Sequence, residues 1–393
     1  MPDRLAPLTL SIMYCLDSEQ GHIFSYNRAF GEAARLLGWE HRATVRAAAR
    51  VAELPPGWTR TLGAQRYFFR GGLPLKFEKE WRLIVTLARY LRALLRTETR
   101  PIILVLEWFH LVHLFAFCAS LLAVPRRREL SALFVYRFAF PNNRDRILYK
   151  LIMAVVRALI GREHVTIFTE TEVAAAALRR DLGQPAHLLP IPNVVLPDEP
   201  VSPPAWASTP ERAGKLVCWW PGVPAVDKGL ALIERLTTLA SPAARELVVV
   251  ADQRAGLSPH PGGCGVHLLA DHLSRAEYAG WLATMDVALL PYAPSAYANR
   301  TSGVLADAVC MGKLPVVRDG TWLARELRRY ALEALIVDWD DPDLPQTLIS
   351  LAQDAAVRAQ LERMSADYLA FHGIRGYART LERVLLGPAR PPA

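Results

Sequence analysis

The sequence predicts an α/β protein with two domains, each built around a parallel sheet. The first observation is a strand at Val287–Leu290, a helix from about Gly303 to Met311 and a strand at Leu314–Val317. This order is a βαβ unit, and βαβ units make parallel sheets. The second is the length of 393 residues, which accommodates two domains of ordinary size. The third is the segment 198–211, whose four prolines and lack of periodicity predict a linker.

The first domain is expected over residues 1–197. Its apolar runs predict strands and its amphipathic runs predict helices. The stretch 45–70 shows no clear period and is rich in Arg, Pro and Gly. The expected elements are the strand Leu8–Cys15, the helix Phe24–Leu37, a helix at 77–96, the strand Ile102–Leu106, a buried helix from about Leu111, the strand Ala132–Tyr136, an apolar segment at 149–160, the strand Val165–Phe168 and a capped helix ending at Gly183.

The second domain is expected over residues 212–373, with a last helix inside 374–393. Alternating apolar runs and amphipathic segments again predict strands and helices. The further expected strands are Leu216–Trp220, Leu247–Ala251, Val266–Ala270 and Leu335–Val337. The further expected helices are Leu230–Leu239, Arg275–Leu282 with Ser274 as its cap, 342–369 and Tyr377–Leu386.

Composition predicts a cytoplasmic globular protein without a metal or disulfide framework. The chain is 52% hydrophobic and 21% charged, and its five cysteines are scattered without a C-x-x-C pair. The N-terminal sequence lacks the layout of a signal peptide. The longest apolar run, Ile102–Val124, contains Glu107, His110 and His113, which are unfavourable in a membrane span. The uninterrupted part, Leu114–Val124, is too short to cross.

The positive charge lies in the first half of the chain. Residues 1–200 hold 27 Lys and Arg against 18 Asp and Glu. One face of the helix at 77–96 carries Arg82, Arg89 and Arg92, and a basic turn follows at Arg126–Arg128. These charges are either solvated or face an anionic membrane surface or acceptor. No zinc-finger, RNA-recognition or basic heptad motif is present, so we expect no nucleic acid partner.

The loop Asn299–Gly303 is a candidate phosphate site. It precedes a helix that Thr301 or Ser302 would cap, and free N–H groups at such a helix start attract anions. Gly303 lets a ligand approach the backbone, and Arg300 adds a forked cation. The alternative is an ordinary capped helix with an exposed Arg.

The segment around this loop resembles the donor-site signature of retaining glycosyltransferases of the GT-B fold, the family-four or group 1 type. That signature has two acidic residues separated by seven, a helix of small residues ending in Gly, and a Pro-Val-Val strand. Asp307 matches the second acid, and Gly312 and Pro315–Val317 match the tail. Asn299 replaces the first acid, so this position carries no negative charge.

A second part of the resemblance lies after the strand Leu216–Trp220. Gly222, Lys228 and Gly229 match residues that grip the donor diphosphate in the family, whereas Val223 replaces its Arg. Arg300 would then supply the missing charge. The alternative for Lys228 is a surface Lys at a helix start, which is an electrostatically poor place for one.

The resemblance implies two Rossmann-like domains facing each other across a cleft, with the last helix crossing back to the first domain. Acceptor residues are then expected in the first domain. Gly21 and His22 lie in the loop after its first strand, and Glu107 and His110 lie at the carboxyl edge of a later strand. The alternatives are that His22 is merely solvated and that Glu107 and His110 form a polar pair with a structural role only.

The implied activity is transfer of a hexose from a nucleotide-diphosphate sugar to a glycan or lipid-linked acceptor, in surface polysaccharide or glycolipid synthesis. We expect no cofactor and no metal; the acids at 340–343 precede a helix, where they are favourable without one. The expected location is the cytoplasm or the inner face of the membrane. The rivals are a GT-B phosphorylase or epimerase, and a non-catalytic paralogue that binds polysaccharide or lipid.

Overall fold

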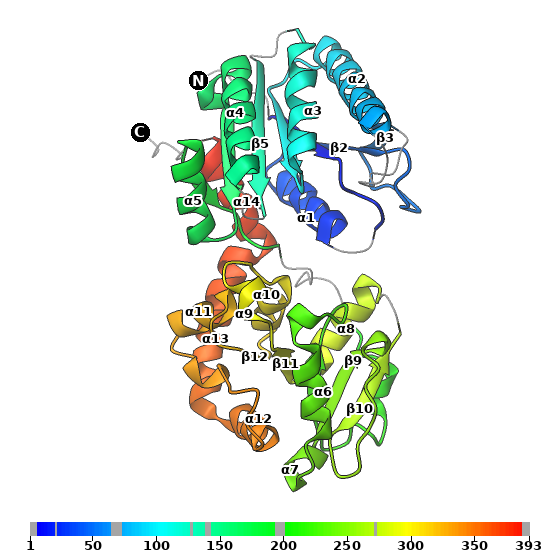
Figure 1. Ribbon diagram of the computed structural model, residues 1–393, viewed down its shortest axis with the longest axis vertical. Helices are drawn as coiled ribbons and strands as arrows, with labels where there is room; N and C mark the ends of the chain where they lie inside the picture. Colours follow the sequence, from blue (N-terminus) through cyan, green and yellow to red (C-terminus); the bar gives the residue numbers. More distant parts are fainter. Residues whose placement is uncertain are drawn as a thin grey trace. The chain divides into compact units, whose positions relative to one another are not determined.

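The computed structural model describes residues 6–19, 22–63, 73–125, 129–137, 143–192, 201–270 and 273–386. The chain forms two compact units (Figure 1). Unit 1 consists of Met1–Pro190 with Tyr377–Ala393, and unit 2 consists of Ile191–Gly376. Each unit contains one sheet, and every strand pair in both sheets is parallel. The predicted α/β class with two parallel sheets is therefore confirmed.

Unit 1 has a seven-stranded sheet in the order β3-β2-β1-β4-β5-β6-β7. The strand order reverses between β1 and β4, and ligands bind beyond the carboxyl ends of strands at such a reversal. The strands are β1 (Leu8–Met13), β2 (Glu40–Arg46), β3 (Trp58–Leu62), β4 (Ile102–Glu107), β5 (Leu130–Tyr136), β6 (Val165–Thr169) and β7 (Ala186–Leu188). The helices are α1 (His22–Leu36), α2 (Leu73–Thr97), α3 (Leu111–Leu122), α4 (Asn143–Ile160) and α5 (Glu172–Leu182), with most of α14 (Ile374–Leu385).

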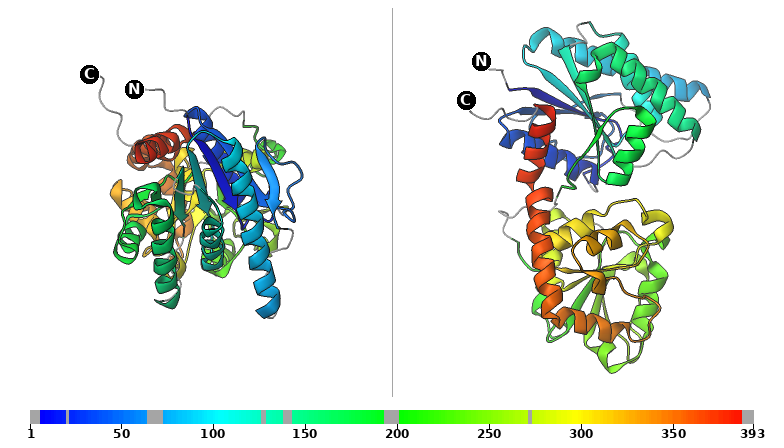
Figure 2. Two further views of the ribbon diagram at one scale, coloured as in Figure 1. Left: turned by 90° about the horizontal axis from the view of Figure 1, so that it is seen from above. Right: turned by 90° about the vertical axis from the view of Figure 1, so that its left-hand side faces the viewer.

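The centre of the unit 1 sheet is buried on both faces. Every residue of β1 and β4 is buried, which explains why these strands read as continuous apolar runs. Helices α2, α3 and α4 lie side by side on one face of the sheet (Figures 1 and 2). Thr171 caps α5 by accepting a hydrogen bond from the backbone of Ala174, and Gly183 ends it with φ of 65°.

Unit 2 has a five-stranded sheet in the order β10-β9-β8-β11-β12. The strands are β8 (Leu216–Trp220), β9 (Leu247–Asp252), β10 (Gly265–Leu269), β11 (Val287–Leu290) and β12 (Leu314–Val317). The helices are α6 (Leu230–Thr238), α7 (Pro242–Arg245), α8 (Arg275–Thr284), α9 (Pro294–Tyr297), α10 (Gly303–Cys310), α11 (Trp322–Arg329), α12 (Leu344–Gln353) and α13 (Ala355–His372). Strand β8 lies at the centre, between β9 and β11, so its carboxyl end meets the loops of both neighbours.

The segment 45–70, which shows no clear period in the sequence, contains β3 and the end of β2, whose polar residues weaken the apolar pattern. Two local predictions were wrong. The predicted strand Leu335–Val337 is a short 3-10 helix at Glu333–Leu335, followed by a single bridge from Ile336 to Val317. The predicted helix 342–369 is two helices, because the carboxylate of Asp354 accepts hydrogen bonds from the backbone of Ala356 and Val357 and so starts α13.

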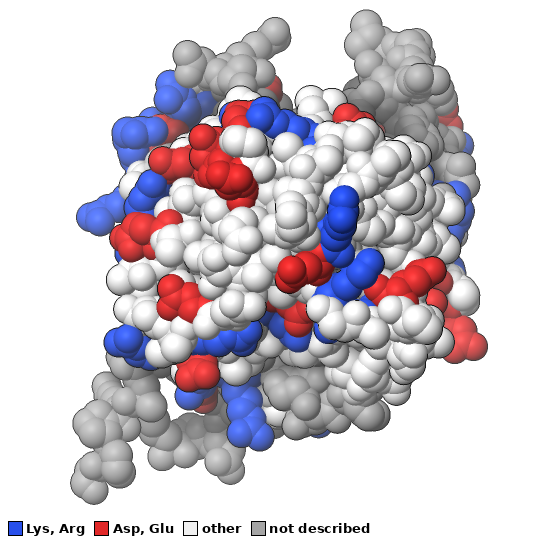
Figure 3. Space-filling view, turned by 90° about the horizontal axis from the view of Figure 1, so that it is seen from below, with Lys and Arg blue, Asp and Glu red and all other residues white. Residues whose placement is uncertain are grey.

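Large apolar side chains are exposed on the outer surfaces of α3 and α4. Phe115, Leu122, Ile147 and Leu151 each leave more than half of their surface exposed. In contrast, the surface seen from below in Figure 3 carries acidic and basic side chains interspersed among uncharged ones. Among the described helices, none is long and apolar enough to cross a membrane. The exposed side chains of α3 and α4 are called the apolar helix face below.

Candidate functional site

In unit 2 the loops that follow β8 and β11 pack against each other. The backbone N–H of Ala293 donates a hydrogen bond to the carbonyl of Asp227, 2.8 Å away. Gly229 has φ of 84°, and a β-carbon there would lie 2.3 Å from the carbonyl oxygen of Pro291. Only glycine allows this approach of the two backbones. The sequence therefore brings Lys228 and the Asn299–Gly303 loop to the same edge of the sheet.

Lys228 lies where the loop after β8 leaves space for it. A β-carbon on Gly222 would lie 2.9 Å from Nζ of Lys228, and Gly222 has φ of 89°. Burial lowers the pKa of Lys228 below its ordinary value of 10.5, Asp227 raises it, and Arg300 lowers it further. The guanidinium of Arg300 lies 3.9 Å from the carboxylate of Asp227, the residue before Lys228, so the structure brings the two predicted cations close together.

Arg300 is exposed and only loosely held. Its guanidinium lies 3.9 Å from the carboxylate of Asp227 and 4.9 Å from the ring centre of Tyr297. Such an exposed ion pair contributes little to stability, so the guanidinium remains available to an anionic ligand. A forked guanidinium suits a phosphate.

The start of α10 completes the donor loop. Ser302 is its N-cap, and its hydroxyl accepts a hydrogen bond from the backbone of Leu305 at 3.2 Å. Gly303 is the first residue of the helix, and Thr301 is half-buried beside it. The backbone N–H groups of a first helical turn have no partner within the helix and carry partial positive charge. This end of α10 therefore suits an anion near Arg300.

The two positions of the acidic signature lie in different environments. Asp307 is buried, and its carboxylate accepts a hydrogen bond from the hydroxyl of Tyr278 at 3.2 Å. Asn299 is exposed, and its side-chain oxygen accepts a hydrogen bond from Arg325 at 3.3 Å. Asp307 is thus part of the packing between α8 and α10, whereas Asn299 stays at the surface.

In unit 1, charged side chains meet where β4, β5 and β6 end. Arg137 follows β5 and forms ion pairs with Glu107 at the end of β4 and Glu170 after β6. Asn27 on α1 also donates a hydrogen bond to Glu107, at 3.3 Å. The side chains of Arg137 and Glu107 are almost completely buried. Buried charge at the carboxyl edge of a parallel sheet is typical of a ligand site, although structural ion pairs also occur there.

Aromatic rings surround this network. The guanidinium of Arg137 lies 4.2 Å from the ring centre of Tyr26 and 5.6 Å from that of Trp108. Trp108 has φ of 55°, which a residue with a side chain rarely adopts. His22, at the start of α1, lies 5.3 Å from Tyr26 between ring centres. The structure therefore groups His22 with the Glu107 network.

His110 and Glu107 do not form the polar pair considered as the alternative. His110 is exposed at the start of α3, and its backbone N–H donates a hydrogen bond to Nδ1 of His113 at 3.1 Å. Glu107 is instead bound by Arg137 and Asn27. Gly21 and the turn Arg126–Arg128 lie outside the described residues.

Sequence reasoning missed Arg137, Glu170 and Asn27. Arg137 and Glu170 each follow a buried strand directly, which is a usable signal once the strands are known to be neighbours. Asn27 lies on the inner side of α1, and nothing in the sequence separates it from other polar residues of that helix.

Within the described ranges, no group of three or more His, Cys, Asp or Glu side chains could hold a metal ion. The acidic side chains of 338–343 form hydrogen bonds and an ion pair with protein groups nearby. The carboxylates of Asp338 and Asp341 accept hydrogen bonds from the backbone of Asp340 and Asp343, both at 2.9 Å. The carboxylate of Asp340 pairs with Arg235.

No protein-family model matches the chain, and no curated protein sequence matches it. Solved structures match nearly all of it. Trehalose-6-phosphate from E. coli bound with UDP-2-fluoro glucose has 12% identity and a TM-score of 0.62, over 98% of this chain and 100% of that one. Sucrose-phosphate synthase from Thermosynechococcus elongatus has 14% identity and a TM-score of 0.60, over 97% and 98%. WaaG, a glycosyltransferase involved in lipopolysaccharide biosynthesis, has 12% identity and a TM-score of 0.54, over 92% and 95%.

At such low identity the similarity shows a shared fold. The chain has the GT-B fold of these glycosyltransferase structures over its full length, with parallel sheets of seven and five strands. The fold expected from the sequence resemblance is confirmed.

Proposed function

We propose that this chain is a retaining glycosyltransferase of the family-four type, which transfers a hexose from a nucleotide-diphosphate sugar to a glycan or lipid-linked acceptor. The observation that carries the proposal is the cation pair of unit 2. Lys228 lies against Gly222, and Arg300 pairs with the neighbouring Asp227 next to the start of α10. Two cations and a helix start around a glycine-lined loop suit a diphosphate.

The chemistry needs positive charge at this place. When the sugar leaves its donor, negative charge builds on the departing diphosphate. Lys228, Arg300 and the backbone N–H groups near Gly303 would stabilise that charge without a metal. Fixed donors of this kind contribute about 3–4 kcal/mol each to transition-state stabilisation. Same-face attack by the acceptor would retain the configuration, because no described residue of this loop is an evident nucleophile.

Unit 1 would hold the acceptor. The site proposed there is the group of His22, Tyr26 and Trp108 around the buried Glu107 and Arg137, with His110 at the start of α3 nearby in sequence. The ion pairs of Arg137 fix Glu107, so we assign Glu107 a positioning role rather than a proton-transfer role. His110, which is exposed, is the better candidate for contact with an acceptor hydroxyl.

A non-catalytic paralogue is the rival that specific residues favour. Val223 stands where the family has Arg, and it is exposed beside Gly222. Asn299 stands where the family has an acid, and it is bonded to Arg325. Both changes would weaken a donor site, but Lys228 and Arg300 remain. We therefore propose a catalytic protein in which Arg300 replaces the missing cation.

The enzyme would work in the cytoplasm at the inner face of a membrane. The apolar helix face offers exposed side chains to lipid, and α2, beside α3, carries exposed Arg82 and Arg89. Apolar side chains beside basic ones are typical of surfaces that bind anionic bilayers. A lipid-linked acceptor would be reached from that position.

The test is donor turnover, measured as release of nucleoside diphosphate with a panel of nucleotide sugars, with and without EDTA. We expect release from at least one sugar nucleotide, and we expect it to survive EDTA because cations of the protein line the site. Binding of nucleotide without turnover under any acceptor would favour the non-catalytic paralogue. Loss with EDTA that Mg²⁺ or Mn²⁺ restores would overturn the metal-independent class.

A further inference from the structure

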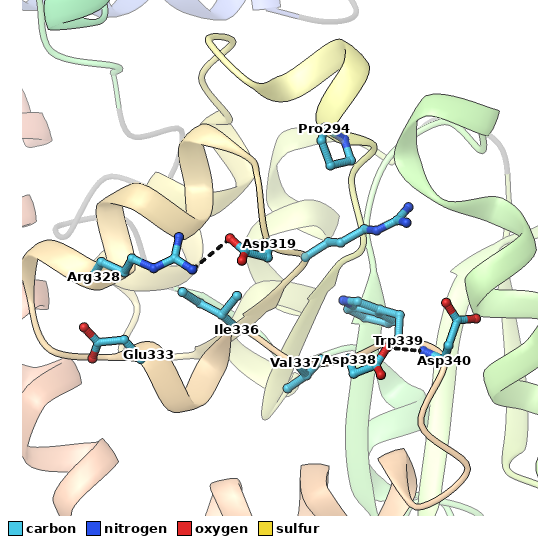
Figure 4. Close-up of a pocket in the computed structure, with 10 residues that line it drawn as sticks. Pro294, Asp319, Arg328, Glu333, Ile336, Val337, Asp338, Trp339 and Asp340 are labelled. Atoms are coloured by element: carbon cyan, nitrogen blue, oxygen red, sulfur yellow. Dashed lines mark hydrogen bonds and ion pairs between the residues drawn. The ribbon is translucent and has the colours of Figure 1, made fainter.

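A pocket of about 510 Å³ lies in unit 2 on the β12 side of the sheet. Its walls come from the end of β12, from α11 and from the segment after it (Figure 4). Pro294, the first residue of α9, also lines it, so the pocket borders the segment that leads into the Asn299–Gly303 loop. The full lining is Pro294, Arg318, Asp319, Arg328, Glu333, Ile336, Val337, Asp338, Trp339 and Asp340.

One buried hydrogen-bond donor of this pocket lacks an acceptor. Trp339 is 3% exposed, and its indole N–H has no partner among the described residues. Figure 4 shows the nitrogen side of the Trp339 ring turned toward the other lining residues. Arg318 is half-buried and forms no ion pair in the described part of the chain, so it adds a positive charge to the lining. Buried donors without acceptors are rare, because each one is unfavourable.

The acceptors of the pocket are carboxylates that keep unused lone pairs. Asp338 accepts one hydrogen bond, from the backbone of Asp340 at 2.9 Å. Asp340 binds Arg235 at the rim, and Glu333 is exposed. Asp319 is held by Arg328 at 2.8 Å, which lowers the pKa of that carboxyl group. A carboxylate has about four acceptor positions, so all of these can accept further bonds.

The mixture of positive and negative groups in the pocket favours a neutral ligand over a charged one. An anion would be attracted by Arg318 but repelled by Asp338, Asp340 and Glu333. A cation would be attracted by the carboxylates but would meet Arg318 and the indole N–H. A neutral ligand whose hydroxyl groups both donate and accept satisfies both kinds of group. Ile336, Val337 and the ring of Trp339 offer apolar surface for the C–H groups of such a ligand.

We infer that this pocket is a binding site for a neutral saccharide of one or two sugar units, separate from the proposed donor site. Its volume lies within the range of about 300–1,000 Å³ that is usual for small-molecule pockets. The inference does not depend on donor turnover. The residues that line the pocket include neither Lys228 nor any residue of the Asn299–Gly303 loop.

The experiment is saturation-transfer NMR on the full chain with maltose as the neutral probe, glucose 6-phosphate as the anionic probe and glucosamine as the cationic probe. We expect transfer to maltose and weaker transfer to both charged sugars. Trp339→Phe removes the N–H but keeps an aromatic ring, and Arg318→Gln removes the charge. Each should weaken maltose binding roughly two- to tenfold, the effect of one lost hydrogen bond.

The matched controls are Trp81→Phe on α2 and Arg245→Gln on α7, both exposed positions outside the pocket. They should bind maltose like the wild type. UDP binding and the thermal midpoint should be unchanged in Trp339→Phe and Arg318→Gln, which shows that the proteins are folded and that the donor site is separate. Absence of maltose binding at about 10 mM, well above a Kd of about 1 mM, would overturn the inference. Preferred binding of glucose 6-phosphate, or unchanged maltose binding in both variants, would do the same.

Discussion

The ammonium nitrogen of Lys228 lies 2.9 Å from the place that a β-carbon would occupy on Gly222. The backbone of Gly222 is in the left-handed region, with φ of 89°, so glycine is favoured there twice, by conformation and by space. The two residues are six positions apart, and the turn between them carries the exposed Val223. The glycine thus makes room for the cation.

Gly222→Ala should weaken binding of a nucleoside diphosphate roughly tenfold, because the methyl group displaces Lys228 and one charge-assisted hydrogen bond is lost. Titration calorimetry with UDP and GDP measures this. Gly256→Ala is the control: Gly256 also has positive φ, 65°, but nothing lies within 4 Å of its added β-carbon. The control should share the backbone strain of about 1 kcal/mol without a change in nucleotide affinity. Equal losses of nucleotide affinity in both variants would show that Lys228 does not contribute to diphosphate binding.

Arg300→Ala should reduce donor turnover roughly 10²–10³-fold if Arg300 stabilises leaving-group charge. Its side chain is 61% exposed and its ion pair with Asp227 spans 3.9 Å, so the thermal midpoint should hardly change. Arg245→Ala, an exposed Arg of the same unit, is the control for a general loss of charge. A folded Arg300→Ala enzyme with wild-type turnover would exclude Arg300 from the mechanism.

The pKa of Lys228, lowered by burial, predicts opposite effects of alkaline pH on binding and on stability. Diphosphate affinity should fall as pH rises through the lowered pKa, because the ammonium loses its charge. The free energy of unfolding should rise between that pKa and 10.5, because the unfolded chain then binds more protons than the folded one. Lys228→Arg should flatten the affinity profile, and Lys215→Arg should leave it unchanged. An alkaline profile that is the same in Lys228→Arg would contradict the assignment.

The sequence predicted the fold best where a signal is local. The strands β8 and β11 are short apolar runs between breakers, and Ser302 marks the start of α10 because its hydroxyl caps the helix. The resemblance assigned Gly222 and Lys228 to one diphosphate site, but their contact was not predicted, because spacing alone does not say where a lysine points.

The network of Arg137 could not be predicted in the same way. Arg137 lies 30 residues from Glu107 and 33 from Glu170. Their meeting depends on β4, β5 and β6 being neighbours in register, which is a property of the whole sheet. The apolar helix face was missed for a related reason. A helix that is apolar on all sides is usually buried, and only the packing of α3 and α4 on the sheet shows which side remains exposed.

Arg137→Met should destabilise unit 1 by about 3–5 kcal/mol, because it leaves the buried carboxylate of Glu107 without its cation. Glu107→Gln should be milder, since Arg137 keeps Glu170. Urea unfolding of both single variants and the double variant gives the coupling energy. Arg180→Met is the control, because Arg180 is exposed and, among the described residues, pairs only with its neighbour Asp181. A loss below about 1 kcal/mol in Arg137→Met would show that the network is not buried as described.

The apolar helix face predicts reversible binding to anionic bilayers. Burying one Phe or Leu side chain contributes about 1.5–3 kcal/mol, and each nearby Arg adds about 1 kcal/mol through the surface potential. Phe115→Ser and Leu151→Ser should therefore each weaken co-sedimentation with phosphatidylserine vesicles roughly tenfold or more, whereas Arg89→Gln should weaken it less and only at low salt. Val173→Ser on α5, an exposed apolar position of the same unit, is the control and should bind normally. If the wild-type chain does not bind strongly anionic vesicles at low salt, or if Val173→Ser loses as much binding as Phe115→Ser, this face does not contact lipid.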